Sequence, residues 1–422
     1  SNISIGVQAN FGADAESHNL SIGQAALGSS VAGGEYNVAI GNLSLDALTA
    51  ASNNVAVGYG AGGAINTGGN NTIMGYIAGA DMTDDTNNVV IGYRAGSALT
   101  DSSNVIIGSD AARQGTTHSA NVIIGMNAAA NGVVTGDNNV VIGKDAGLSF
   151  TSANGNVVLG MEAGEAMASS DGNTLVGFQA GKALNYDGDS YNVIMGYQAG
   201  LSLTNAAYNT LIGGFAGDGY DTENHNTAVG YLALSGPVAG GEYNVAVGNY
   251  TLDALTSGDD NVALGYNALG ALTTGSDNVA IGSYALDAGT GSDFNVAIGH
   301  NALTSNTANN CTAVGYLAGE DNTAHELTAF GSKAAMNNTS GGGITAIGRE
   351  AYNNADTESH NLAVGLNALG GAINGGEYNV AVGNYTLDAL TSADKITAVG
   401  YQAGSAHTTG ANCVFMGYQA GL

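Results

Sequence analysis

The sequence predicts an all-β protein: a parallel β-solenoid, or β-roll, of about 25 rungs with a period close to 17 residues. A phrase of the form Asn-Val-Ala-Ile-Gly, as in residues 295–299, returns 25 times along the 422 residues. A repeat this short cannot bury a core of its own, so each copy must stack on its neighbours. Glycine is abundant, at 68 residues, and Pro237 is the single proline, which suits a chain of many tight corners.

The repeat never pauses long enough to leave room for a domain boundary. We therefore expect a single β-solenoid domain over residues 1–422. Both ends of the sequence fall within the repeat register, whereas stacks of this kind normally need capping ends. The expectation is that the chain is a segment of a longer fibre protein.

Four residues before the glycine, Asn stands in 20 of the 25 repeats. The departures are Cys311, Leu327, Ile344, Ile396 and Cys413. Stacked from rung to rung, these side-chain amides predict a hydrogen-bonded ladder whose role is to fix the turn. Rungs of 16 to 19 residues occur, and the length changes fall in the variable polar turn before the Asn, where they disturb no ladder.

The three residues between the Asn and the glycine are largely apolar, which predicts a strand covered on both faces. The residue next to the glycine is always large, as in Ile298, and we expect this column to fill the interior of the coil. The small column, as in Ala297, would then face an axis shared by several chains, which predicts a homotrimer. The alternative is a wider single-chain coil.

The glycine is present in every repeat, either because the corner requires positive φ or because a neighbouring backbone comes too close for a Cβ atom. Three residues later, Ala occurs in 22 repeats. This small-residue step is interpreted as the start of a second strand.

Composition excludes some partners. Seven basic residues against 35 acidic ones give a formal charge of −28, and the basic residues are scattered singly. Nucleic acid is excluded because phosphate binding requires a clustered basic footprint. No apolar run is long enough to span a membrane, and we expect no direct membrane insertion. Cys311 and Cys413 lie six rungs apart, roughly 29 Å at about 4.8 Å per rung, too far for a disulfide within one chain.

No constellation of catalytic, cofactor-binding or metal-ligating residues stands out, and we expect no enzyme activity and no cofactor. The seven histidines lack metal-ligand spacing. Acid-rich turns, such as those at Asp84-Asp85 and at Asp187 with Asp189, could hold Ca²⁺ through oxygen ligands, but they are interpreted as solvated turns because they match no calcium motif.

Tyrosine directly follows the corner glycine in nine repeats. A column of rings could offer amphipathic platforms to sugars or proteins, or it could simply pack half-buried along the ladder. The nine residues of this candidate recognition column are Tyr59, Tyr76, Tyr93, Tyr197, Tyr231, Tyr266, Tyr316, Tyr401 and Tyr418.

The unit Asn295-Val296-Ala297-Ile298-Gly299 with Ala302 resembles the head repeat of YadA-type trimeric autotransporter adhesins. Copies such as residues 226–234, Asn-Thr-Ala-Val-Gly-Tyr-Leu-Ala-Leu, are still more similar to the repeat arrays of phage tail fibres. The resemblance covers essentially the whole chain. It implies a trimeric left-handed parallel β-roll that lies outside the cell, in a virion tail fibre or a cell-surface appendage.

The leading hypothesis is a structural and adhesive fibre shaft of a phage tail fibre, which spaces and presents an element that binds a host receptor. Its partners would be copies of itself and a host cell-surface glycan or protein, bound directly or through a tip domain. The alternatives are the head domain of a bacterial trimeric surface adhesin and a polysaccharide-cleaving enzyme of the tailspike kind, which would need a carboxylate pair in a groove.

Overall fold

The computed structural model describes residues 1–10, 18–29, 32–237 and 240–422. The chain divides into two compact units, Ser1–Ile212 and Gly213–Leu422, and each is described by itself. Within the described residues the regular secondary structure is β-strand, and there is no helix long and apolar enough to span a membrane. The predicted all-β parallel solenoid with a period close to 17 is confirmed, whereas a single domain over residues 1–422 stays a prediction.

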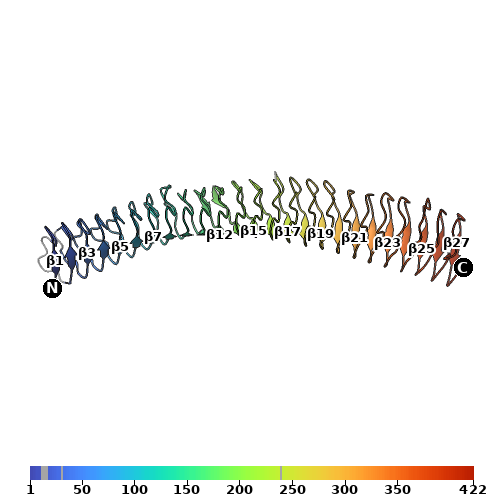
Figure 1. Ribbon diagram of the computed structural model, residues 1–422, viewed down its shortest axis with the longest axis horizontal. Coiled ribbons are helices and arrows are strands. Elements are labelled where there is room, and N and C mark those ends of the chain that lie inside the picture. Colours follow the sequence, from blue (N-terminus) through green and yellow to red (C-terminus); the bar gives the residue numbers. More distant parts are fainter. Residues whose placement is uncertain (11–17, 30–31, 238–239) are drawn as a thin grey trace. The chain divides into compact units, whose positions relative to one another are not determined.

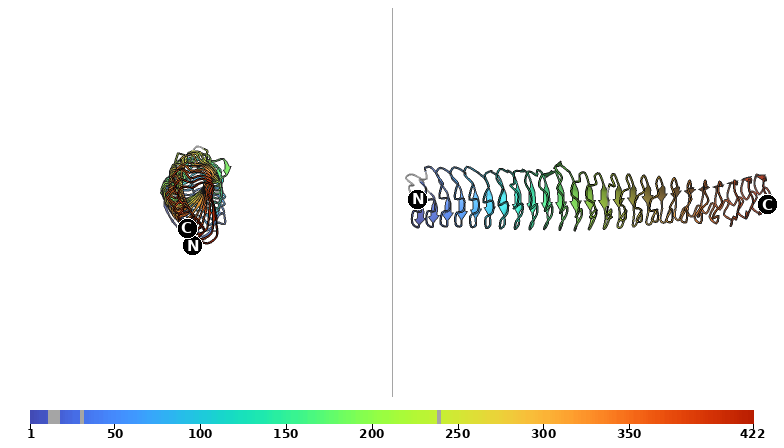
Figure 2. Two further views of the ribbon diagram at one scale, coloured as in Figure 1. Left: turned by 90° about the vertical axis from the view of Figure 1, so that its right-hand side faces the viewer. Right: turned by 90° about the horizontal axis from the view of Figure 1, so that it is seen from above.

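Each repeat contributes one three-residue strand that ends directly before the corner glycine, and Figures 1 and 2 show the strands of each unit side by side in chain order. In the first unit these strands are β1 (Ile3–Ile5), β2 (Leu20–Ile22), β3 (Val38–Ile40), β4 (Val55–Val57), β5 (Thr72–Met74), β6 (Val89–Ile91), β7 (Val105–Ile107), β8 (Val122–Ile124), β9 (Val140–Ile142), β10 (Val157–Leu159), β12 (Thr174–Val176), β14 (Val193–Met195) and β15 (Thr210–Ile212). A separate parallel pair is formed by β11 (Ser170–Asp171) and β13 (Gly188–Asp189).

The second unit repeats the same arrangement. Its strands are β16 (Thr227–Val229), β17 (Val245–Val247), β18 (Val262–Leu264), β19 (Val279–Ile281), β20 (Val296–Ile298), β21 (Thr312–Val314), β22 (Thr328–Phe330), β23 (Thr345–Ile347), β24 (Leu362–Val364), β25 (Val380–Val382), β26 (Thr397–Val399) and β27 (Val414–Met416). Successive strands pair in parallel, so that Val279 lies beside Val296. Repeats of different length keep this register: the partner of Val296 in the next repeat is Thr312, one residue earlier than the usual period. Length changes are therefore confined to the turns, as predicted.

The chain beyond the corner glycine is built from turns, and the predicted second strand is wrong for the described residues outside β11 and β13. The second and fourth residues after the glycine have positive φ, 54° at Asn301 and 52° at Leu303. Their N–H groups point in opposite directions along the stack: Asn301 donates to the Ser283 carbonyl (3.1 Å) and Leu303 to the Ala318 carbonyl (3.0 Å). A left-handed conformation costs roughly 1–2 kcal/mol per residue, and these hydrogen bonds between rungs offset part of that cost.

The corner glycine satisfies both reasons proposed for it. At Gly265 φ is +134°, and a Cβ atom would lie 2.7 Å from both the carbonyl carbon and the carbonyl oxygen of Gly282 in the next rung. The backbones of adjacent rungs therefore touch at the corner. Any side chain there would meet backbone atoms that cannot move without breaking the stack.

The two strand faces are the reverse of the prediction. From β2 to β26 the middle residue of each three-residue strand, such as Ala280 or Ala297, is buried inside the coil. The large residue before the glycine instead points outward and is 45% exposed at Leu264. One three-residue strand per rung encloses only a narrow space, and side chains from the turns opposite, such as Leu286 and Leu272, already fill it. The small side chain is therefore needed inside.

The large side chain that fills the core comes from the strand in some rungs and from the turn after the glycine in others. Where the strand supplies Ala280, the fourth residue after the glycine is Leu286, and both are fully buried. Where the strand supplies Ile194, the same turn position is Gly200, whose Cβ would lie 3.2 Å from Ile194 Cδ1. In these rungs the interior volume is kept while its source changes between strand and turn.

The predicted asparagine ladder is present and buried. Asn278 Oδ1 accepts hydrogen bonds from both the backbone N–H and the Nδ2 of Asn295, each at 3.1 Å. Asn295 Nδ2 also donates to the carbonyl of Ala308 in the following turn (3.0 Å). Each side chain therefore links three rungs, which supports the predicted turn-fixing role.

The ladder changes columns near Cys311, where three successive repeats lack the usual asparagine. Cys311 takes the usual position, and its Sγ lies 3.3 Å from the Ala324 carbonyl. In these repeats Asn306, Asn322 and Asn338 stand seven positions after the glycine, where many other repeats have a buried apolar residue such as Leu272. Asn322 Nδ2 donates to Asn306 Oδ1 (2.9 Å), and Asn338 Nδ2 donates to Asn322 Oδ1 (2.7 Å). Cys311 is a buried free thiol, and Cys413 is a free thiol in the last repeat.

Candidate binding surface

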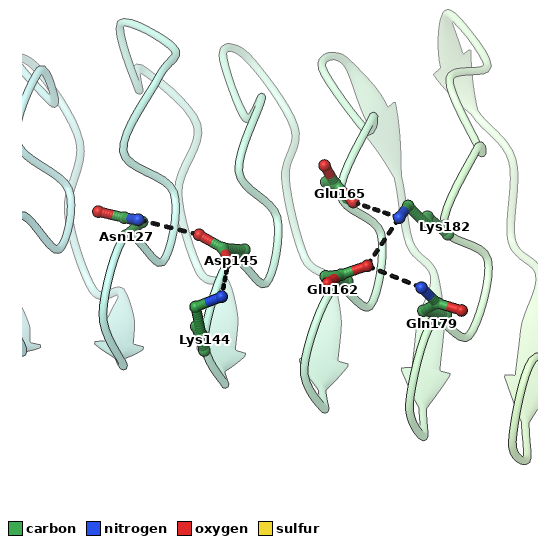
Figure 3. A network of polar contacts seen from close by, with 7 residues as sticks. All are labelled: Asn127, Lys144, Asp145, Glu162, Glu165, Gln179 and Lys182. Carbon is green, nitrogen blue, oxygen red and sulfur yellow. Dashed lines mark hydrogen bonds and ion pairs between the residues drawn. The ribbon is translucent and has the colours of Figure 1, made fainter.

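The first, second and fifth residues after each corner glycine lie on one side of the coil, which we call the post-glycine face. Figure 3 shows it in the first unit, where Glu162 and Glu165 of one rung meet Gln179 and Lys182 of the next. Lys182 Nζ lies 2.7 Å from Glu162 Oε2 and 3.0 Å from Glu165 Oε2, and Gln179 Nε2 donates to Glu162 Oε2 (2.8 Å). Hydrogen bonds from Lys182 and Gln179 lower the pKa of Glu162. Second and fifth positions of neighbouring rungs are therefore in contact.

The nine predicted tyrosines all lie on this face, in separate groups rather than in one column. Tyr59, Tyr76 and Tyr93 form a stacked run with ring centroids 5.4 Å apart and interplanar angles of 16° and 11°, and the Arg94 guanidinium lies 5.1 Å from the Tyr93 centroid. Tyr197 stacks on Phe178, and Tyr401 and Tyr418 stack on each other. The remaining three predicted tyrosines are Tyr231, Tyr266 and Tyr316 of the second unit.

In the second unit, rings that the sequence analysis missed fill the rungs between the predicted tyrosines. The longest unbroken series, which we call the aromatic run, is Phe215, Tyr231, Tyr250, Tyr266, Tyr284, His300 and Tyr316. Consecutive centroids are 5.4–6.4 Å apart. Tyr250 and Tyr284 were missed because they stand second after the glycine rather than first. Tyr385, which contacts Tyr401 edge to face at 6.2 Å, was missed for the same reason but lies outside this series. The available signal was an aromatic residue at either position in every consecutive repeat.

The aromatic run differs in geometry from the stacked tyrosines of the first unit. From Phe215 to His300, neighbouring rings meet edge to face, with interplanar angles of 71° to 87°. In the stacked run each inner ring is covered on its faces by its neighbours, which leaves mainly edges to solvent. Perpendicular neighbours cannot cover one another face to face. The exposed fractions are nevertheless similar in the two groups, 45% at Tyr266 and 38% at Tyr284 against 46% at Tyr76. The orientation of the rings, and not their total exposure, therefore distinguishes the aromatic run from the stacked run.

Polar side chains border the aromatic run. Asn267 Nδ2 donates to Asp287 Oδ1 at 2.6 Å, and burial, followed by the charge of Asp253, raises the pKa of Asp287. Asn301 Nδ2 lies 3.5 Å from Glu320 Oε1, while its Oδ1 is shielded from solvent and has no hydrogen-bond partner. Hydrogen-bond acceptors thus lie directly beside the rings.

Four further histidines pack against other residues of the coil. His18, His225 and His360 each stack on a tyrosine of the following rung at 4.9–5.1 Å, in three copies of the same local geometry. His118 is fully buried: its Nδ1 lies 3.2 Å from Asn104 Oδ1, its Nε2 has no partner, and burial lowers its pKa to about 4. The missing side chain at Gly115 makes room for this ring.

The acid-rich turns use their carboxylates locally. Asp85 Oδ2 accepts a hydrogen bond from the Thr83 N–H (2.9 Å), and Asp187 Oδ1 accepts one from Ser169 Oγ (3.0 Å). Across the part of the chain that the structure describes, no three or more His, Cys, Asp or Glu side chains are grouped so as to hold a metal ion.

No family model, curated protein or solved structure matches this chain. What the protein does must therefore be inferred from the residues and their placement. The two surfaces repeated over many rungs are the post-glycine face and the outward side of the strands.

Proposed function

We propose that this segment is a structural and adhesive fibre shaft, part of a phage tail fibre or a similar extracellular appendage, which assembles with copies of itself and presents a receptor-binding element. The observation that carries the proposal is the outer strand face, formed by the residues one and three positions before every corner glycine. In all 25 repeats these residues are Val, Ile, Leu, Met, Phe or Thr, and none is charged.

The outer strand face is apolar and only half covered. Leu264 is 45% exposed, Met195 41% and Val262 37%. Parallel sheets are normally buried on both faces, and a large contiguous apolar patch on a protein marks an interaction site. We therefore expect a partner to cover the outer strand face along each unit.

A second copy of the same chain is the partner that fits best. The patch recurs once per rung, and only a surface with the same rise per rung can match it over many rungs. Symmetric self-association supplies such a surface without any further protein. The homotrimer predicted from the sequence is kept in this proposal, with one change: the large residues, rather than the alanines, face the other chains.

The composition and the repeat pattern fit a role as a scaffold. A charge of −28 with scattered cations gives no footprint for nucleic acid. The rung keeps its strand register although its core residues vary between strand and turn and its asparagine ladder changes columns near Cys311. Such tolerance is typical of repeat arrays, in which each unit interacts only with its neighbours and length can change without altering the cross-section.

The spacer role is tested by removing a block of rungs in register. Deleting residues 226–360 joins His225 to Asn361, which stands in the position that Asn226 leaves, and removes eight rungs. At about 4.8 Å per rung, the assembled particle should become roughly 38 Å shorter in electron micrographs and remain folded. Deleting residues 226–368 breaks the register and serves as the control that should not fold. An in-register deletion that unfolds, or leaves the particle length unchanged, would contradict the proposal.

A further inference from the structure

The aromatic run has a two-rung alternation that extends to its polar neighbours. Rungs with the ring second after the glycine, at Tyr250 and Tyr284, carry an aspartate in the fifth position, Asp253 and Asp287. The rungs that follow carry the ring in the first position, at Tyr266 and His300, and an asparagine in the second, Asn267 and Asn301. Rings and hydrogen-bonding groups therefore recur together along the stack.

We propose that the aromatic run and its bordering Asp and Asn side chains bind an extended, neutral polysaccharide that lies along the stack of rungs. The rings occur once per rung at steps of 5.4–6.4 Å, comparable with the size of one sugar ring. A polymer of sugar rings can thus meet one aromatic side chain after another. A compact small ligand would use only one or two of them.

The geometry suits the two kinds of contact that a sugar offers. The apolar side of a pyranose packs on an aromatic face, and edge-to-face neighbours leave such faces open between Tyr231 and Tyr284. Sugar hydroxyls donate to carboxylate and amide oxygens.

The charges around the aromatic run favour a neutral polymer over an acidic one. Between Lys182 and Lys333 the sequence contains no Lys or Arg, so the whole aromatic run lacks cations. Asp253, Asp287 and Glu320 border it. Lys333 lies in the rung after Tyr316, at the end of the run, and its backbone N–H donates to the Tyr316 carbonyl (2.8 Å). Along the rest of the run a polymer that carries carboxylates or phosphates would meet negative charge, which disfavours acidic glycans.

The first unit supplies a matched contrast. Tyr59, Tyr76 and Tyr93 have the same residue type on the same face, but they are stacked on one another. If exposed tyrosine alone were sufficient, both groups would bind. If open ring faces with polar neighbours are required, only the aromatic run binds.

This inference rests on the proposed display function, because the aromatic run must stay open when the chain assembles. The two fail separately: native mass tests the assembly, and polymer binding tests the aromatic run. A chain that remains monomeric could still bind a polysaccharide, and an assembled fibre could fail to do so.

The experiment is affinity electrophoresis of the full chain through gels that contain a neutral glucan, a galactomannan or a xylan, with polygalacturonate as the acidic polymer. We expect retardation by at least one neutral polymer and none by polygalacturonate. The variant with Tyr231, Tyr250, Tyr266, Tyr284 and Tyr316 changed to Ser should bind about tenfold more weakly or worse. The control with Tyr59, Tyr76 and Tyr93 changed to Ser should bind like the unmodified chain.

A second measurement needs no variant. In the unmodified chain, the bound polymer should protect Tyr250, Tyr266 and Tyr284 from nitration, while Tyr59, Tyr76 and Tyr93 react as before. The proposal is overturned if no neutral polymer retards the chain, if an oligolysine peptide is the only probe protecting these tyrosines, or if both tyrosine variants lose binding equally. It is also overturned if the five-residue variant loses its native mass, because the rings would then form an interface between chains.

Discussion

The corner glycine is the residue that every rung shares, and two separable effects act on it. Its φ is one that other residues adopt only with strain, and its Cβ position is occupied by the next rung. Gly375 also has a positive φ, +96°, but no atom lies within 4 Å of its Cβ position. The two sites therefore separate backbone strain from steric overlap.

We expect Gly265→Ala to destabilise the surrounding rungs by about 3 kcal/mol or more, because strain adds to a clash with backbone atoms. Gly375→Ala should cost only about 1 kcal/mol, the strain alone. Hydrogen exchange at the flanking rungs measures both. Equal effects at the two positions would show that the close approach of the rungs has no energetic weight.

His118 makes the fold sensitive to acid. Its pKa falls from an ordinary value near 6.5 to about 4 because burial disfavours the charged ring more than Asp101 and Asp137 favour it. A group whose pKa is lower in the folded state contributes stability above the unfolded pKa and loses it as the pH falls through the folded pKa. Between pH 6.5 and 4 the protein should lose up to about 3 kcal/mol through this group.

The comparison of His118→Gln with the unmodified protein tests this pH dependence. The variant should unfold less steeply between pH 6.5 and 4, as followed by circular dichroism, even if it is less stable at pH 7. His325→Gln, at an exposed turn, is the control and should leave the slope unchanged. A slope that survives the loss of His118 would assign the acid sensitivity to other groups.

Each strand has one face in the coil and one face turned outward, so charge on the outward face should break assembly without unfolding the coil. We expect the triple variant Leu264→Glu, Ile281→Glu and Ile298→Glu to abolish association, because three buried unpaired charges per chain cost several kcal/mol. Circular dichroism should still report the folded coil. Static light scattering measures the mass.

The matched control places the same charges in the same rungs at the exposed turn positions Ser257, Thr274 and Gly291. These changes should leave the mass of the assembly intact. If the strand variants keep the mass of the unmodified protein, the outer strand face is not the interface.

The period predicted the coil, and the recurring asparagine predicted its ladder, because both depend on residues that every rung repeats. The direction of the strand faces could not be predicted, because three consecutive apolar residues do not reveal which of them points inward. The answer lies in the turns: Leu286 fills the interior opposite Ala280, and Gly200 leaves room for Ile194. The second side of the coil also escaped prediction, since leucine and asparagine residues with positive φ resemble no standard strand or helix pattern.

Only part of the aromatic run was predicted from the sequence, for a similar reason. Tyrosines directly after the glycine were visible as a column, but Tyr250 and Tyr284 stand one residue later. Rings at both positions reach the same face because the intervening chain is a tight turn. The exchange of Cys311 for asparagines at Asn306 and Asn322 likewise becomes visible only when both sides of the rung are placed together.

The chain as a whole combines a regular apolar face with a strongly acidic character. Each copy carries a formal charge of −28, so copies that associate repel one another at long range. Salt screens this repulsion but leaves apolar burial in place. Association should therefore tighten as the salt concentration rises, the opposite of what an interface held by ion pairs would do.

The most direct test of the account is the native mass of the unmodified chain in solution, measured by multi-angle light scattering at about 0.15 M salt. A shaft that assembles through its outer strand faces should have about three times the chain mass of 41.6 kDa. A folded, soluble particle of 41.6 kDa whose mass does not change with concentration or salt would contradict it, because the apolar strand face would then be stable in water without a partner.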